Sequence, residues 1–180
     1  MKSPTRPYFA YGSNLNRSDM RTRCPDARPD VPARLEDWRL TFRGVADIEP
    51  AAGGTVHGAL WWLSADDVLS LDAYEGAPSH YRRRTVEVQT DDGPREAMTY
   101  VMTRSAYLGL PSSWYFRRIE AGFRDWELPL EDLWRALQET RDQLDGLGVE
   151  RYRRDGRKRM RAILEAEDAV RIRRETPSPR

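Results

Sequence analysis

A short run of small and polar residues follows the first strand that the sequence predicts. Residues 8–11 form an aromatic strand candidate, and the segment at its end consists of Tyr11, Gly12, Ser13, Asn14 and Leu15. A glycine followed by small polar residues allows successive backbone N–H groups to point into one space, which makes a nest for a carboxylate or an oxyanion. The same pattern also suits an ordinary turn between a strand and a helix, so on spacing alone both interpretations stand.

A carboxylate that could act as a base lies in a second segment, at residues 71–76. Glu75 comes at the end of an expected helix, directly before Gly76. The negative end of the helix dipole disfavours the charged form of a nearby carboxylate, so we expect a slightly raised pKa, which suits a general base. A solvated glutamate at a helix end is the alternative.

Strands supply most of the frame expected around these two segments. Alternating or continuous apolar residues predict strands at 8–11, 38–43, 55–63, 85–90 and 96–102. Residues 91–93, Asp-Asp-Gly, indicate a hairpin, and residues 51–54, Ala-Ala-Gly-Gly, a flexible turn. Within the third strand, Gly58 is expected to mark a close approach of two backbones.

Three helices complete the expected frame. Ser64 is a good N-cap for a helix that ends near Gly76 and turns Val68 and Leu71 inward. From Ser112 onward the apolar residues recur at helical spacing and predict two amphipathic helices. Their apolar positions are Tyr115, Ile119, Phe123 and Trp126 in the first, and Leu130, Leu133, Trp134, Leu137 and Leu144 in the second. A β-rich beginning followed by a helical end predicts an α+β fold.

Composition limits the classes of function. The chain has 180 residues, of which 39% are hydrophobic and 33% are charged, and this composition suits one globular domain. A net charge of +1 argues against general nucleic-acid binding, and no apolar run approaches the length of a membrane span. The single cysteine, Cys24, and the lack of an apolar signal segment favour the cytoplasm. Arginine is strongly preferred over lysine, which is a weak indication of a bacterial source.

We expect a domain at residues 1–145 and a basic helical extension with a frayed end at 146–180. Residues 151–161 hold seven basic residues and one acid. A solvated terminal helix is the simpler interpretation, and a site for an acidic partner is the alternative.

Other chemistries fit the residues less well. Cys24 has only His57 and His80 as partners for nucleophilic catalysis, and two histidines with one cysteine make a poor zinc site. Ser13 is followed by no base at a recognisable spacing. The three arginines at 82–84 suit an alternating strand surface, with a substrate clamp as the alternative.

Taken together, the two segments resemble the γ-glutamyl cyclotransferase family, including its AIG2-like members. Residues 8–15, Tyr-Phe-Ala-Tyr-Gly-Ser-Asn-Leu, are similar to the entrance motif of that family, and residues 71–76 are similar to the segment with its catalytic glutamate. Residues 33–38, 111–115 and 128–130 resemble further family segments, so the resemblance spans roughly residues 7–140. The segment between Phe42 and Thr55 is shorter than in glutathione-related members, and residues after about 145 match no family segment.

The resemblance implies a small mixed β-barrel flanked by helices, with one pocket at its mouth. It implies that the substrate's α-amino group attacks its own γ-carbonyl, which forms 5-oxoproline and releases an amine without a metal or another cofactor. Glu75 would be the acid–base residue. The N–H groups of Gly12, Ser13 and Asn14 would hold the α-carboxylate or the oxyanion, and Tyr81 and Tyr115 would border the pocket. Tyr11 and Leu15, which flank the three N–H groups in the entrance motif, complete the expected substrate-binding residues.

The identity of the leaving amine stays open. It could be an amino acid or dipeptide, a lysine-type amine, or a biosynthetic intermediate that carries a γ-glutamyl protecting group, as in an antibiotic pathway. The short insert and the aromatic strand slightly favour a bulky leaving group. A non-catalytic small-molecule-binding module is the alternative from another class, and a homodimer is left open.

Overall fold

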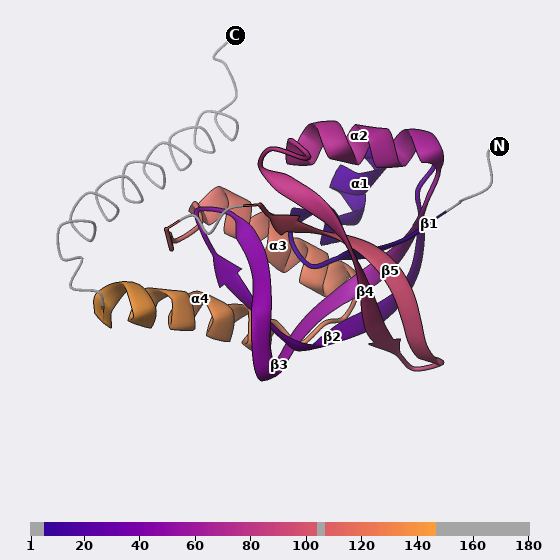
Figure 1. The fold of residues 1–180 in the computed structure, drawn as a ribbon. Helices are drawn as coiled ribbons and strands as arrows, with labels where there is room; N and C mark the ends of the chain where they lie inside the picture. The colour runs from indigo at the N-terminus through magenta and orange to yellow at the C-terminus, as the bar shows by residue number, and fades with distance from the viewer. Residues whose placement is uncertain (1–5, 104–106, 147–180) are drawn as a thin grey trace, which may run out of the picture.

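Five strands close into a small barrel in the computed structural model, which describes residues 6–103 and 107–146 (Figure 1). In spatial order the strands are β1 (Arg6–Ala10), β3 (Ala46–Leu63), β2 (Arg28–Phe42), β4 (Tyr81–Thr90) and β5 (Gly93–Met102). Neighbouring strands are antiparallel except β1 and β5, which pair in parallel at Tyr8 and Met98 and close the barrel. The expected α+β fold with a mixed barrel is confirmed.

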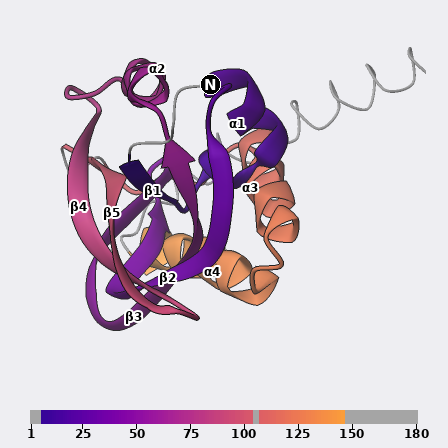
Figure 2. The same cartoon turned by 90° about the vertical axis from the view of Figure 1, so that its right-hand side faces the viewer.

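Helices cover one side and one end of this barrel. The helices α3 (Ser113–Asp125) and α4 (Leu130–Gly146) pack along one side, whereas α1 (Arg17–Arg23) and α2 (Ala65–Glu75) lie near one end (Figures 1 and 2). A single turn of 3-10 helix, η1 (Ser13–Leu15), links β1 to α1 and packs against α3. The two segments singled out in the sequence, η1 and the end of α2, therefore lie at the same end of the barrel.

Local sequence fixes both ends of α2. The Ser64 side chain accepts a hydrogen bond from the Asp67 N–H, and the Asp67 carboxylate accepts one from the Ser64 N–H. At the other end, Gly76 adopts the left-handed conformation with a φ of 62°, which a residue without a Cβ reaches without strain. Val68 and Leu71 are buried as expected. Because both caps are local, they set Glu75 as the last residue of the helix.

The expected turn at residues 51–54 is wrong: these residues lie inside the long strand β3. The chain reverses at residues 43–45 instead, where Gly44 has a φ of 80°. Opposite residues 51–54 the pairing of β2 and β3 shifts register, and the Gly53 N–H donates to the Asp37 carboxylate at 2.8 Å. A β-bulge and a turn both favour glycine, and here the side chain of Asp37 provides the partner that the bulge needs.

The two C-terminal helices agree with the apolar spacing, with one exception. Ile119, Phe123 and Leu133 are buried, whereas Trp134 is half-exposed and packs one ring edge against Phe116. None of the helices in the described part of the chain combines the length and apolar character needed to cross a membrane. The expected extension lies almost wholly outside the described residues and stays a prediction.

We predict that Gly58→Ala destabilises the barrel by about 1–3 kcal/mol. A Cβ at Gly58 would lie 2.3 Å from the Ala10 carbonyl oxygen and 2.6 Å from the Phe9 ring, which confirms the expected close approach of two backbones. Urea denaturation measures the change, with Gly146→Ala as the control, since nothing lies within 4 Å of that added Cβ. Equal stability of the two variants would contradict the prediction.

Candidate active site

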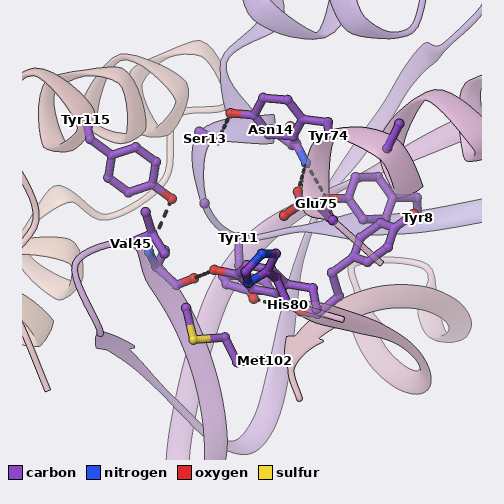
Figure 3. A pocket seen from close by; sticks show the side chains of 16 residues that line it. Tyr8, Tyr11, Ser13, Asn14, Val45, Tyr74, Glu75, His80, Met102 and Tyr115 are labelled. Atoms are coloured by element: carbon purple, nitrogen blue, oxygen red, sulfur yellow. Dashed lines mark hydrogen bonds between the residues drawn. The ribbon is translucent and has the colours of Figure 1, made fainter. Parts of the chain in front are cut away.

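One cavity of about 600 Å³ opens where η1, the end of α2 and the tip of the β2–β3 hairpin meet (Figure 3). Six of its lining residues are tyrosines that come from β1, the loop after it, α2, β4, β5 and α3. The full lining is Tyr8, Tyr11, Gly12, Ser13, Asn14, Val45, Ala46, Ala73, Tyr74, Glu75, Gly76, His80, Tyr81, Tyr100, Met102 and Tyr115. A concave, mostly apolar cavity with a few polar groups that converge is the usual form of a small-molecule site.

The Glu75 carboxylate is the acid of this cavity. Its Oε1 accepts a hydrogen bond from Asn14 Nδ2 at 2.8 Å, which joins the two sequence segments directly (Figure 3). Burial raises the pKa of Glu75 to about 7, against the opposing effects of the Asn14 hydrogen bond and the Arg23 charge. The sequence argument expected a small rise caused by the helix dipole, whereas the main cause is the removal of the carboxylate from water. A carboxyl group with this pKa can both accept and return a proton near neutral pH.

Gly12, Ser13 and Asn14, at the start of η1, line the same cavity. The Leu15 N–H donates to the Gly12 carbonyl at 3.0 Å and the Asn16 N–H to the Ser13 carbonyl at 3.2 Å, which makes one tight turn. Within the described residues, no hydrogen bond uses the N–H groups of Gly12, Ser13 or Asn14. Free N–H groups beside a cavity are donors for an anionic group of a ligand.

The family model described as gamma-glutamyl cyclotransferase, AIG2-like, matches residues 8–119, which include both η1 and Glu75. The chain belongs to this family. It is 34% identical over 139 residues to human gamma-glutamylcyclotransferase, which covers 69% of this chain and 73% of the relative, and 33% identical to the bovine protein of the same name with the same coverage. A solved structure titled gamma-glutamyl cyclotransferase superposes with a TM-score of 0.67 at 31% identity and covers 73% of this chain and 85% of that one.

Seven of the eight residues that the sequence placed at the site line the cavity of this γ-glutamyl cyclotransferase family member. They are Tyr11, Gly12, Ser13, Asn14, Glu75, Tyr81 and Tyr115. Leu15 does not: its side chain is fully buried and packs at Gly122 of α3, where an added Cβ would lie 2.5 Å from the Leu15 Cβ. Ser13 and Asn14 line the cavity, whereas Leu15 fills the core beside α3, so we correct Leu15 from a binding residue to a residue that packs η1 against α3.

The hydroxyl groups of Tyr81 and Tyr115 hold the hairpin tip against the cavity. Tyr81 donates to the Ala46 carbonyl at 2.6 Å, and Tyr115 accepts from the Ala46 N–H at 3.2 Å. The hydrogen of Tyr81 is therefore already used, while that of Tyr115 remains able to donate to a ligand. Both rings still form walls of the cavity.

Several lining residues were missed by the sequence reasoning, because their positions depend on contacts between distant segments. The Tyr74 hydroxyl lies 3.4 Å from Ser13 Oγ, and the Tyr100 hydroxyl donates to Asp72 at 2.7 Å. Both carboxylate oxygens of Asp72 also accept hydrogen bonds from Arg83. The arginines at 82–84 do not line the cavity, and Arg83 has this structural ion pair, which favours the strand-surface interpretation over a substrate clamp.

Proposed function

We propose that the protein is a γ-glutamyl cyclotransferase, which releases 5-oxoproline and a free amine from a γ-glutamyl amide. The observation that carries this proposal is the partly buried Glu75 carboxylate, which accepts a hydrogen bond from Asn14 in the cavity that Gly12, Ser13 and Asn14 also line. The names of the relatives in the same family point to the same activity. A binding-only member would be expected to lack the acid or to have the N–H groups of the turn blocked. Glu75 in the cavity, together with N–H groups of Gly12, Ser13 and Asn14 that no described hydrogen bond uses, supports the enzyme over such a module.

The proposed reaction needs only proton transfers and one exchange of bonds. Glu75 removes a proton from the substrate's α-ammonium group, and the resulting amine attacks the γ-carbonyl carbon. The new C–N bond closes a five-membered ring and places a negative charge on the carbonyl oxygen. When the oxyanion collapses, the original C–N bond breaks as protonated Glu75 gives its proton to the leaving nitrogen. The ring nitrogen, which became positively charged when it attacked, releases its second proton to the Glu75 carboxylate, and Glu75 then passes that proton to the free amine or to water. Proton transfer of this kind is commonly worth about 10²–10⁴-fold in rate.

The rest of the cavity supplies position and charge stabilisation. The N–H groups of Gly12, Ser13 and Asn14 would hold the α-carboxylate or the oxyanion, and one oxyanion donor is worth roughly 2.7–4 kcal/mol. Tyrosine faces suit both the aliphatic chain and the ammonium group of the glutamyl unit. The nucleophile and the carbonyl are tethered in one molecule, so little entropy is lost when they meet.

The size of the cavity bears on the leaving amine. At about 600 Å³ it lies within the usual range for drug-sized ligands, so a bulky leaving group is accommodated beside the glutamyl unit. An antibiotic-type intermediate with a γ-glutamyl protecting group is one candidate substrate of this kind. Cytoplasmic location, a bacterial source and a homodimer stay predictions from the sequence.

A panel of γ-glutamyl compounds tests the function directly. It should contain γ-glutamyl amino acids and dipeptides, ε-(γ-glutamyl)-lysine and bulkier γ-glutamyl amines, and 5-oxoproline release is the readout. We expect release from at least one class, abolished when the substrate's α-amino group is acetylated. Failure of the whole panel to yield 5-oxoproline would contradict the proposed activity.

We predict that Gly12→Ala lowers kcat/KM about tenfold without unfolding the protein, mainly through a higher KM. A Cβ added at Gly12 would lie 3.2 Å from the Ala46 Cβ at the cavity wall, which is tighter than an ordinary van der Waals contact. Adding Ala46→Gly removes that contact and keeps the Ala46 backbone that Tyr81 and Tyr115 hold. The double variant should recover most of the activity, and a double variant as impaired as the single one would contradict the steric explanation.

A further inference from the structure

We propose that Arg23 on α1 is a positioning residue, which fixes the side chain of Asn14 and so sets the pH range in which Glu75 can act as a base. Arg23 does not line the cavity, so it would act on the reaction through its hydrogen bond to Asn14 and through its charge, without touching the substrate. The link to catalysis depends on the proposed function, whereas the effect on the ionisation of Glu75 does not.

The first step of the argument is the orientation of the Asn14 amide. Arg23 Nη1 donates to Asn14 Oδ1 at 2.7 Å, and a guanidinium has donors but no acceptor. If the amide were turned by 180°, its NH₂ group would face those donors, so Arg23 permits one orientation only. In that orientation Asn14 Nδ2 donates to Glu75 Oε1 and to the Tyr8 hydroxyl, each at 2.8 Å. Both amide hydrogens are thus used, and one of them is directed at the acid–base residue.

The second step is how firmly Arg23 is held. Its guanidinium lies 3.9 Å from the centre of the Tyr74 ring, and Nη2 lies 3.3 Å from an Asp19 carboxylate oxygen. Arg118 of α3 binds both oxygens of the same carboxylate and in turn stacks 4.3 Å from the Trp114 ring centre. Contacts from two helices therefore hold the guanidinium in place against Asn14.

The third step is the charge that Glu75 experiences. The Arg23 side chain is only 14% exposed, so water screens its charge weakly. This charge lowers the pKa of Glu75 and opposes the effect of burial. The other titratable groups that face the cavity are His80 and the six tyrosines, Tyr8, Tyr11, Tyr74, Tyr81, Tyr100 and Tyr115. Burial raises the pKa values of Tyr8, Tyr11, Tyr81, Tyr100 and Tyr115, so these five are uncharged near neutral pH and do not replace the effect of Arg23.

The test is a direct titration of the Glu75 carboxyl group by NMR in the full-length, ¹³C-glutamate-labelled protein, with Glu75→Gln used to assign the signal. Arg23→Met removes the charge and the donor, whereas Arg23→Gln removes the charge but keeps a donor for Asn14 and so protects the fold. In either variant we expect the titration midpoint to rise by at least about half a unit, which lowers the ionised fraction about threefold at acidic pH. Arg23→Lys should stay near the wild type. Arg21→Met, an exposed arginine of the same helix, is the matched control and should not move the midpoint.

The kinetic counterpart is the acid limb of the pH profile of kcat/KM, which should move to higher pH in Arg23→Met and Arg23→Gln. An unmoved midpoint in both variants would overturn the proposal, as would an equal shift in Arg21→Met. A uniform loss of kcat/KM at every pH with an unmoved midpoint would also overturn it, because a merely structural role predicts that pattern. If the wild type released no 5-oxoproline, the proposed function would fail while the titration still decided the role of Arg23.

Discussion

Glu75→Gln is expected to lower kcat at least about 100-fold while the protein stays folded. Glutamine has nearly the same shape, and its Oε1 can keep the hydrogen bond that Asn14 Nδ2 donates to Glu75. It cannot accept a proton from an ammonium group, so the attacking amine would not form. KM should change much less, because the N–H groups of η1 that would hold the substrate are untouched.

The measurement is steady-state kinetics on the best compound of the γ-glutamyl panel, with a thermal melt to confirm folding. Glu87→Gln is the matched control, since Glu87 is an exposed residue of β4 and lies outside the cavity. Comparable turnover of Glu75→Gln and the wild type would remove Glu75 from the mechanism. A large rise in KM with unchanged kcat would instead make Glu75 a binding residue.

The part of the site that could be predicted from the sequence is the part fixed by local signals. Ser64 and Gly76 set the two ends of α2, so the position of Glu75 in its helix follows from residues within twelve positions of it. Residues 8–15 form the end of a strand and the turn that follows it. The path of the chain in that turn depends on Gly12 and its polar neighbours. Family resemblance then joined the two segments, which neither local pattern could have done alone.

The contacts that tune the site could not be predicted in this way. Asn14 meets Glu75 across 61 positions of sequence, and α3 supports Arg23 through an ion pair between Arg118 and Asp19, 99 positions apart. Such pairs depend on how the barrel closes, and the periodicity of apolar residues along the chain does not predict that closure. The bulge at residues 51–54 shows the same limit, because Gly-Gly serves a turn and a bulge equally well until its partner strand is known.

Burial of Glu75 links the proposed chemistry to stability. Its ordinary pKa of 4.5 is raised to about 7 in the folded protein, mainly because the folded state removes the carboxylate from water. In the unfolded chain the same group ionises at its ordinary pKa. The folded state therefore binds more protons than the unfolded state between these two values, and stability falls as the pH rises through this range. The decrease in stability caused by Glu75 is complete above about pH 7, and there is no decrease below about pH 4.

We therefore expect Glu75→Gln to be more stable than the wild type at about pH 8, by about 3 kcal/mol, and to show almost no difference near pH 4. Glutamine carries no charge at either pH, so it avoids the unfavourable burial of a carboxylate. Urea denaturation at a series of pH values measures the difference in unfolding free energy, and Glu87→Gln should show no such trend. A constant difference across this range would mean that Glu75 ionises alike in the folded and unfolded chains, and a less stable variant at about pH 8 would mean that the carboxylate is favourably bound. If the stability gain appears together with the loss of turnover, the burial that destabilises the fold is the same burial that gives Glu75 a pKa near neutrality.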